Sequence, residues 1–210
     1  MTYYNRDYWE DMYGCDIAAL PWEIPEPPTE IRDYISTHPG SGGKALDAGC
    51  GTGNFSLYLA KNGYDVSGID YSEKAITVAQ ERAQEQRLDT TFVRGDLTEL
   101  TNLLPSDSFK LILDYKVSHH LKDEQLLAYA EQCYALLKSG GHILLVCYSE
   151  KDTDAAGNRS AIGKYGNEMF YRTREQIVKF FHAFQVHDYK EVMLGKRLNH
   201  AGHCLVFEKP

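Results

Sequence analysis

Three glycines stand close together between a short apolar run and a stretch with helical spacing, in the segment Asp47-Ala-Gly-Cys-Gly-Thr-Gly53. Glycine lets a chain turn sharply and lets a ligand approach the backbone closely, and the first N–H groups of a following helix are left free. Gly49, Gly51 and Gly53 have G-x-G-x-G spacing, whereas the dinucleotide fingerprint is G-x-G-x-x-G and would need glycine at Asn54. The loop therefore predicts a ligand-binding turn and disfavours a nicotinamide dinucleotide.

Carboxylates lie at the ends of three expected strands. Asp70 ends the second strand, where a carboxylate accepts hydrogen bonds from a ribose diol. Asp96 ends the third, although it could also cap a helix. Asp47 precedes the glycine loop and could face a cationic amine. A pyrophosphate would be ill served by these carboxylates, so they favour a zwitterionic amino acid joined to a nucleoside.

Strand and helix patterns alternate along the part of the chain that would position these residues. Apolar runs predict strands at 45–48, 64–69, 90–94, 109–114 and 142–148, and helical spacing predicts helices at 55–61, 73–87 and 123–138. A helix at 173–182 and strands at 184–189 and 202–208 follow. Such alternation predicts an α/β fold with a doubly wound parallel sheet.

We expect one domain over residues 1–210, made of four parts. Residues 1–43 are rich in aromatic residues and proline and form an N-terminal cap segment, with short helices near 5–13 and 29–36, the second capped by Thr29. Residues 44–148 form the ligand-binding core. Residues 149–172 are polar and break the rhythm, which predicts an insertion over the carboxyl edge of the sheet. Residues 173–210 supply the last helix and strands.

Five segments together resemble one enzyme family. Leu46–Gly53 looks like motif I of the class I methyltransferases that use S-adenosylmethionine (SAM), and the similarity continues through Val66–Ser72, Gly95–Leu97, Phe109–Asp114 and Leu136–Gly141. The resemblance implies SAM as the cofactor. It also implies a Rossmann-like sheet of seven strands, the last of them antiparallel.

The same resemblance assigns residues to the parts of the cofactor. They are Asp47, Gly49, Gly51 and Gly53 for the methionine part, Asp70 for the ribose, Tyr71, Asp96 and Leu97 for the adenine, and Asp114 beside the methyl group. For Tyr71 and Leu97, ordinary packing in the core is the alternative.

The N-terminal cap segment has a resemblance of its own. Trp9–Tyr13 followed by Pro21 and Trp22 is similar to the start of thiol, halide and metalloid methyltransferases, of the tellurite-resistance and thiopurine groups. In such enzymes this segment folds over the cofactor, which would place Trp22 in the cofactor site, where aromatic rings can attract a sulfonium. Anchoring of a helix to the core is the alternative role for the two tryptophans.

Methyl transfer needs little acid–base chemistry, because the sulfonium is already activated and positioning can supply much of the rate. The resemblance places Tyr115 beside the methyl-transfer site, and His119 follows the fourth strand as the candidate base or orienting group. The leading hypothesis is transfer to a small molecule, with a soft nucleophile (thiol, halide or metalloid anion) slightly favoured. N- or O-methylation of a metabolite with His119 as base, and a non-catalytic SAM-binding protein, are the alternatives.

Composition sets limits on partners and location. A formal charge of −8 disfavours nucleic acid as a partner, although a local basic patch is compatible with it, and no apolar run is long enough for a membrane span. Scattered cysteines without a signal peptide predict a cytoplasmic protein with free thiols. The spacing of His200, His203 and Cys204 matches no zinc pattern, so we expect no metal site. We expect a small-molecule methyl acceptor as partner, and a monomer or weak dimer.

Overall fold

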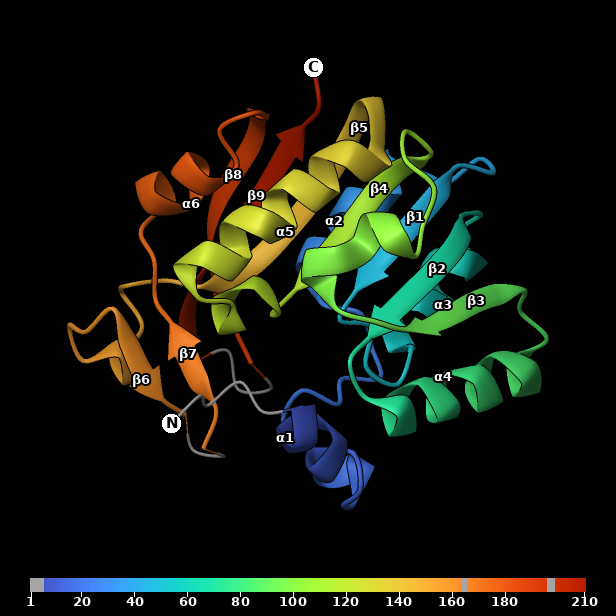
Figure 1. Ribbon diagram of the computed structural model, residues 1–210, viewed down its shortest axis with the longest axis horizontal. Helices are drawn as coiled ribbons and strands as arrows, with labels where there is room; N and C mark the ends of the chain where they lie inside the picture. The colour runs from blue at the N-terminus through green and yellow to red at the C-terminus, as the bar shows by residue number, and fades with distance from the viewer. Residues whose placement is uncertain (1–5, 164–165, 196–198) are drawn as a thin grey trace.

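The structure, a computed structural model (Figure 1), describes residues 6–163, 166–195 and 199–210. The strands in these ranges are β1 (Lys44–Ala48), β2 (Asp65–Asp70), β3 (Thr90–Arg94), β4 (Phe109–Tyr115), β5 (Leu137–Tyr148), β6 (Ser160–Ile162), β7 (Glu168–Phe170), β8 (Gln185–Leu194) and β9 (His200–Glu208). The α-helices are α1 (Arg6–Met12), α2 (Thr29–Thr37), α3 (Asn54–Lys61), α4 (Glu73–Gln86), α5 (Asp123–Leu136) and α6 (Arg174–Phe180). Four 3₁₀ helices in the described ranges are η1 (Ile17–Ala19), η2 (Leu97–Asn102), η3 (Ser118–His120) and η4 (Thr153–Ala155).

Seven strands form one sheet in the order β3-β2-β1-β4-β5-β9-β8 (Figure 1). The first five pair in parallel, whereas β9 pairs antiparallel with both β5 and β8. The predicted doubly wound sheet of seven strands with an antiparallel last strand is therefore confirmed.

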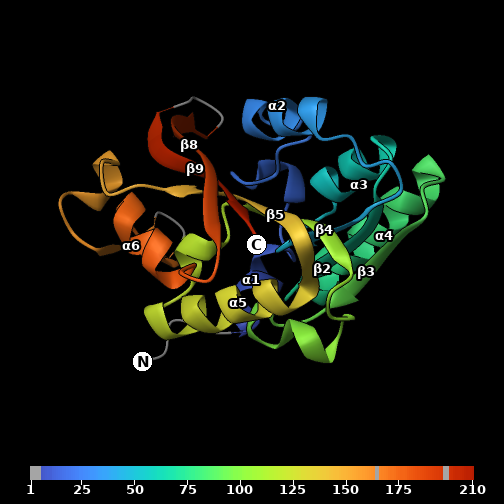
Figure 2. The same ribbon diagram turned by 90° about the horizontal axis from the view of Figure 1, so that it is seen from above.

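Helices cover both faces of the sheet, with α2, α3 and α4 on one and α5 and α6 on the other (Figure 2). Side chains alternate between the faces along β4, so Ile112 joins the cluster under α5, whereas Leu111 and Leu113 join the cluster under α2 and α3. All three are at most 1% exposed. Burial on both faces explains why β4 is apolar along almost its whole length.

Several local signals are confirmed and a few are corrected. The Ser72 hydroxyl caps α4 by accepting from the Ala75 N–H, and Thr173 caps α6. Thr29 was expected to cap α2, but Pro28 stands at that position and Thr29 is the first helical residue. Helix α5 ends at Leu136 rather than 138, because residues 137–141 already extend along β5.

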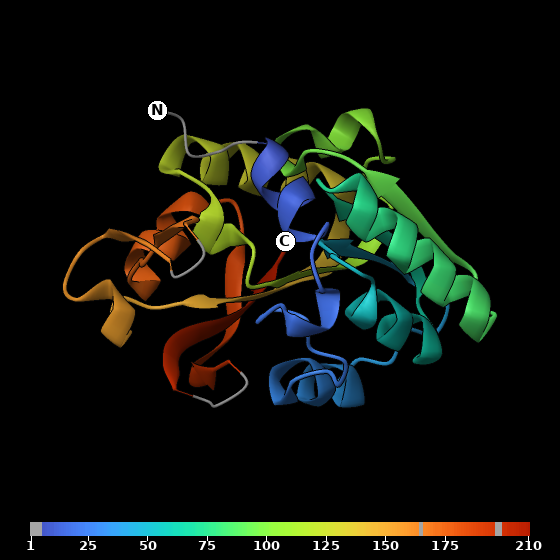
Figure 3. The ribbon, with the colours of Figure 1, turned by 90° about the horizontal axis from the view of Figure 1, so that it is seen from below.

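The predicted insertion contains more structure than its polar sequence indicated. It holds η4 and a two-stranded antiparallel sheet of β6 and β7, which pairs apart from the main sheet. Helix α1 lies at the same side of the molecule (Figure 3). Residue 5, the expected start of the first helix, is outside the described residues. Among the described helices, none combines the length and apolar character needed to cross a membrane.

Candidate active site

A cavity of about 510 Å³ opens where the parallel strands end. Its walls come from the loops after β1, β2, β3 and β4, from the N-terminal cap segment, from the insertion and from the turn between β8 and β9. Figure 3 looks toward this side, with α1 between the orange insertion and the green α4. Its volume lies within the range of small-molecule sites.

The glycine loop has a backbone that only glycine adopts easily. Gly49, Gly51 and Gly53 have φ of 70°, 52° and 81°. A Cβ on Gly49 would lie 2.6 Å from Val117 Cγ2, and one on Gly51 would lie 2.6 Å from the Tyr13 hydroxyl oxygen. Side chains at these two positions would therefore collide with the cavity walls, which explains the glycines.

Gly53 and Asp114 are the predicted site residues that do not line the cavity. A Cβ on Gly53 would lie 3.0 Å from Ala79 Cβ and 3.1 Å from the Phe92 ring. Gly53 therefore allows the start of α3 to pack closely on α4 and β3, while Gly49 and Gly51 face the ligand space.

Two buried carboxylates flank the glycine loop. Asp70 accepts hydrogen bonds from the Gly51 N–H at 2.8 Å and from the Ser72 N–H at 2.9 Å. Asp47 accepts from the Ser56 hydroxyl at 2.6 Å. Burial raises the pKa of Asp47 to about 7, and the nearby Asp70 carboxylate adds to the shift. Burial also raises the pKa of Asp70, against the lowering effect of its backbone hydrogen bonds. A cationic group bound beside Asp47 would lower its pKa again, because it would stabilise the ionised carboxylate.

The part of the cavity at the ends of β2 and β3 is lined by Tyr71, Asp96 and Leu97, the residues that were predicted to contact the adenine. Asp96 Oδ1 accepts from the Thr98 N–H at 2.8 Å and from the Thr98 hydroxyl at 2.7 Å, so it does cap η2. The capping role and a place in the cavity wall are compatible, because Asp96 lines the cavity as well.

Aromatic side chains of the N-terminal cap segment close the cavity from outside. Trp9, Tyr13 and Trp22 all line it, and the Trp22 ring lies 5.4 Å from Trp9 and 6.4 Å from Tyr13 between ring centres. Trp22, which was predicted to lie in the cofactor site, thus lines the cavity, and the Tyr13 hydroxyl lies close to Gly51 of the glycine loop.

Glu23 fastens this segment to the glycine loop and gave no signal in the sequence. Its carboxylate accepts from the Thr52 hydroxyl at 2.8 Å and from the Asn54 amide at 2.9 Å, and pairs with the Arg82 guanidinium at 2.9 Å. Its partners are 29 to 59 residues away in the chain. Only the folded chain brings them together.

We expect Glu23→Ala to lower the affinity for the cavity's ligand by about tenfold and the unfolding free energy by about 2 kcal/mol, because a buried ion pair is broken. Titration calorimetry and thermal unfolding measure the two effects. Glu26→Ala is the control, since Glu26 is an exposed residue of the same segment. Equal behaviour of the two variants would contradict the fastening role.

The opposite half of the cavity is walled mainly by rings. His119 is 2% exposed, and its ring lies 4.2 Å from that of His120 and 4.6 Å from that of Tyr148. Burial lowers the pKa of His119 well below its ordinary value, and the charges of His120 and Lys116 add to the effect. The imidazole is therefore neutral at neutral pH, with a lone pair on one ring nitrogen. Tyr115 also lines the cavity, with its ring 5.2 Å from Phe55.

Asp114 points the other way, because consecutive side chains of a strand alternate between faces. Tyr115 faces the cavity, whereas the fully buried Asp114 carboxylate lies on the α5 side. The resemblance placed both residues beside the methyl-transfer site, and only Tyr115 has a side chain in the cavity wall.

Sequence reasoning did not identify several residues of this half. The additional wall residues include Lys116, His120, Tyr148, Asn167, Met169, Tyr171 and His200. The insertion was expected at this edge, but its polar sequence did not indicate which side chains turn inward.

His200 does not cluster with His203 and Cys204, its neighbours in sequence, but with two aspartates of the insertion. Its Nδ1 lies 3.2 Å from Asp152 Oδ2 and 3.7 Å from Asp154 Oδ2. His203 lies elsewhere, with Nε2 at 3.1 Å from Glu150. The three side chains of His200, Asp152 and Asp154 form an ion-pair cluster at the cavity rim, and their ligand atoms lie close enough together to hold a cation.

The core is similar in sequence to known methyltransferases. A family model described as a methyltransferase domain matches residues 45–141. A ubiquinone biosynthesis O-methyltransferase of Coxiella burnetii is 36% identical over 102 residues, covering 49% of this chain and 42% of that protein. A 2-heptyl-1-hydroxyquinolin-4(1H)-one methyltransferase of Mycobacteroides abscessus is 29% identical over 156 residues, covering 71% and 67%. The chain spans 60% or less of the length of the first curated relatives that it matches.

Among solved structures, a Burkholderia thailandensis 1,6-didemethyltoxoflavin-N1-methyltransferase with bound 1,6-didemethyltoxoflavin and S-adenosylhomocysteine has a TM-score of 0.75. It is 18% identical, and the match covers 97% of this chain and 86% of that one. At this identity the likeness concerns the fold alone.

Proposed function

We propose that this chain is a class I SAM-dependent methyltransferase that transfers a methyl group from SAM to a small molecule. The proposal rests mainly on the hydrogen bond that joins the glycine loop to Asp70. Gly51 donates its N–H to the Asp70 carboxylate, at 2.8 Å, and both residues line the cavity. SAM supplies a methyl group that is already activated on a sulfonium.

The residues on the glycine-loop side fit SAM. Gly49 and Gly51 line the cavity with backbone atoms, which a ligand can approach closely. Asp47 is buried with a raised pKa, which a bound ammonium would lower again. Asp70 keeps free acceptor capacity on both oxygens, since a carboxylate has about four lone-pair sites, and can accept from a ribose diol. Tyr71 and Leu97 provide apolar surface for a purine.

For the acceptor we propose a hydroxyl or N–H group on an aromatic metabolite. Tyr115, Tyr148 and Tyr171 line that half of the cavity together with three histidine rings, and planar rings pack well on other rings. His119 is neutral because of its burial, so it could take the proton that such an acceptor must lose. The two curated relatives described above act, by their names, in O-methylation and on a hydroxyquinolone.

A soft nucleophile is the second candidate, favoured by the N-terminal cap segment. Trp9, Tyr13, Pro21 and Trp22 all line the cavity, in keeping with the resemblance to thiol, halide and metalloid methyltransferases. Such a nucleophile would need no base, so the two candidates differ in their need for His119.

Titration calorimetry with SAM and S-adenosylhomocysteine tests the cofactor, and an acceptor panel of phenols, hydroxyquinolones, thiols and halides tests the reaction. We expect micromolar binding of both nucleosides and formation of S-adenosylhomocysteine with at least one acceptor class. A folded protein that binds neither nucleoside would refute the proposal. Binding without turnover across the panel would favour a non-catalytic SAM-binding protein.

A further inference from the structure

We propose that Asp114 is a positioning residue, whose buried carboxylate fixes the turn that presents His119 to the acceptor. The role in the reaction rests on the proposed function, whereas the role in holding the turn rests on the geometry alone. Asp114 does not line the cavity, so it acts through the backbone and not by touching a ligand.

The carboxylate holds the first two N–H groups beyond the turn. Asp114 Oδ1 accepts from the Val117 N–H at 3.1 Å and from the Ser118 N–H at 3.2 Å. These donors stand at the start of η3, where helical N–H groups have no partner within the helix. Asp114 thus supplies the acceptor that a helix-capping residue would give, from the end of the preceding strand.

The turn between Asp114 and η3 has an unfavourable backbone. Lys116 has a φ of +66°, in the left-handed region that residues other than glycine rarely adopt. Its N–H donates to the Val146 carbonyl oxygen at 2.7 Å. Strained residues persist only where the surroundings fix them, and they gather at functional sites. Two sets of hydrogen bonds restrain this turn. Asp114 accepts from the two residues that follow Lys116, and the Lys116 N–H itself donates to β5.

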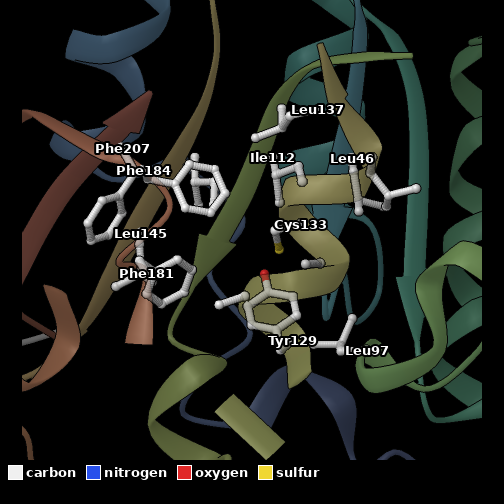
Figure 4. Close-up of a cluster of buried hydrophobic side chains, with 14 of the residues drawn as sticks. Leu46, Leu97, Ile112, Tyr129, Cys133, Leu137, Leu145, Phe181, Phe184 and Phe207 are labelled. Atoms are coloured by element: carbon white, nitrogen blue, oxygen red, sulfur yellow. The ribbon is translucent and has the colours of Figure 1, made fainter. Parts of the chain in front are cut away.

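Burial of this carboxylate is costly and packing alone does not explain it. Asp114 is 0% exposed, and no ion pair to it is found among the described residues. Burial raises its pKa to about 6, although the hydrogen bonds from Ser118 and Val117 oppose the shift. On the far side lies α5, where Figure 4 shows the Tyr129 ring beside Cys133 in the apolar cluster. An apolar residue would pack there more cheaply, so the carboxylate is retained for its two N–H partners.

The turn sets the position of the acceptor side of the cavity. Val117 contacts the glycine loop, since a Cβ on Gly49 would meet it at 2.6 Å. His119 lies two residues later, packed on Tyr148. A shift of the turn would therefore move the imidazole relative to the acceptor, and errors near 1 Å in a reacting geometry cost about 100-fold in rate.

Asp114→Ala, Asp114→Asn and the control Tyr134→Phe test the proposal by amide hydrogen exchange, SAM binding and steady-state kinetics. In Asp114→Ala we expect loss of exchange protection at Val117 and Ser118 and a fall in kcat of about 100-fold, with SAM affinity within threefold. Asp114→Asn keeps an acceptor oxygen and should restore protection and most of kcat. Tyr134→Phe changes another tyrosine of α5, one that packs on Phe184, and should change neither.

Protected amides and a kcat within threefold of the wild type in Asp114→Ala would overturn the proposal. So would an Asn variant as impaired as the Ala variant, because the carboxylate's charge and not its acceptor role would then matter. Should the Ala variant not fold, Asp114→Ser, too short to reach both N–H groups, takes its place. Amide hydrogen exchange is measured without a methyl acceptor. A wild-type protein without activity would therefore refute the proposed function, whereas the exchange data would still decide the role of Asp114 in holding the turn.

Discussion

Asp70→Ala is expected to weaken SAM binding by at least 100-fold while the protein stays folded. The carboxylate would lose its bonds to the ribose, each about 1.5–3 kcal/mol for a charged acceptor, so two lost bonds correspond to about 100-fold or more. It would also release the Gly51 N–H, which it holds at 2.8 Å, and loosen the glycine loop. Titration calorimetry measures the affinity, and circular dichroism checks the fold.

Asp65→Ala is the matched control, because Asp65 starts the strand that Asp70 ends and its side chain is exposed. Its ion pair with Lys44, at 3.6 Å, lies at the surface and contributes little. If the Asp70 variant bound SAM as tightly as this control, Asp70 would not be the ribose-binding residue. The assignment of the glycine loop to SAM would then lose its main support.

His119→Ala is expected to lower kcat for a hydroxyl or N–H acceptor by about 10²–10⁴-fold, the usual contribution of a general base. SAM affinity should change little, since His119 lies in the acceptor half of the cavity. Because burial keeps the pKa of His119 well below its ordinary value, the imidazole is neutral from mildly acidic pH upward, and the wild-type rate should show no loss near pH 6.5 from its protonation. Initial rates over a pH series measure both effects.

His182→Ala, a change at an exposed histidine, serves as the control. A thiol or halide acceptor offers the contrast within the same variant, because it has no proton to lose and should be methylated by His119→Ala nearly as fast as by the wild type. Full activity of His119→Ala with every acceptor would exclude the base role and leave His119 as a packing residue.

The sequence was most informative where structure depends on neighbours in the chain. The glycine loop, the Ser72 cap and the strand at 90–94 follow from local conformational preference and period, and the structure has them where they were expected. The boundary between α5 and β5 was misplaced because Gly140 and Gly141 resemble a helix end. In the fold these glycines instead pair with Lys209 at the far end of the chain.

The site was predictable only in part, for the same reason. Residues just after strands share an edge of the sheet, so Asp47, Asp70 and Asp96 could be brought together from topology alone. Which way each side chain points depends on a one-residue register, and this decides that Tyr115 enters the cavity and Asp114 does not. Contacts such as that of Glu23 with Arg82 join distant parts of the chain and leave no local pattern.

The position of Glu23 makes the N-terminal cap segment and the cofactor thermodynamically linked. Glu23 accepts hydrogen bonds from Thr52 and Asn54, which both line the cavity. If the docked segment strengthens cofactor binding by some factor, a bound cofactor must favour docking by the same factor. Product departure then requires that the docked segment be released or that the ligand slip past it, so the slow event in a catalytic cycle can be an opening of the segment around Glu23 rather than the transfer of the methyl group.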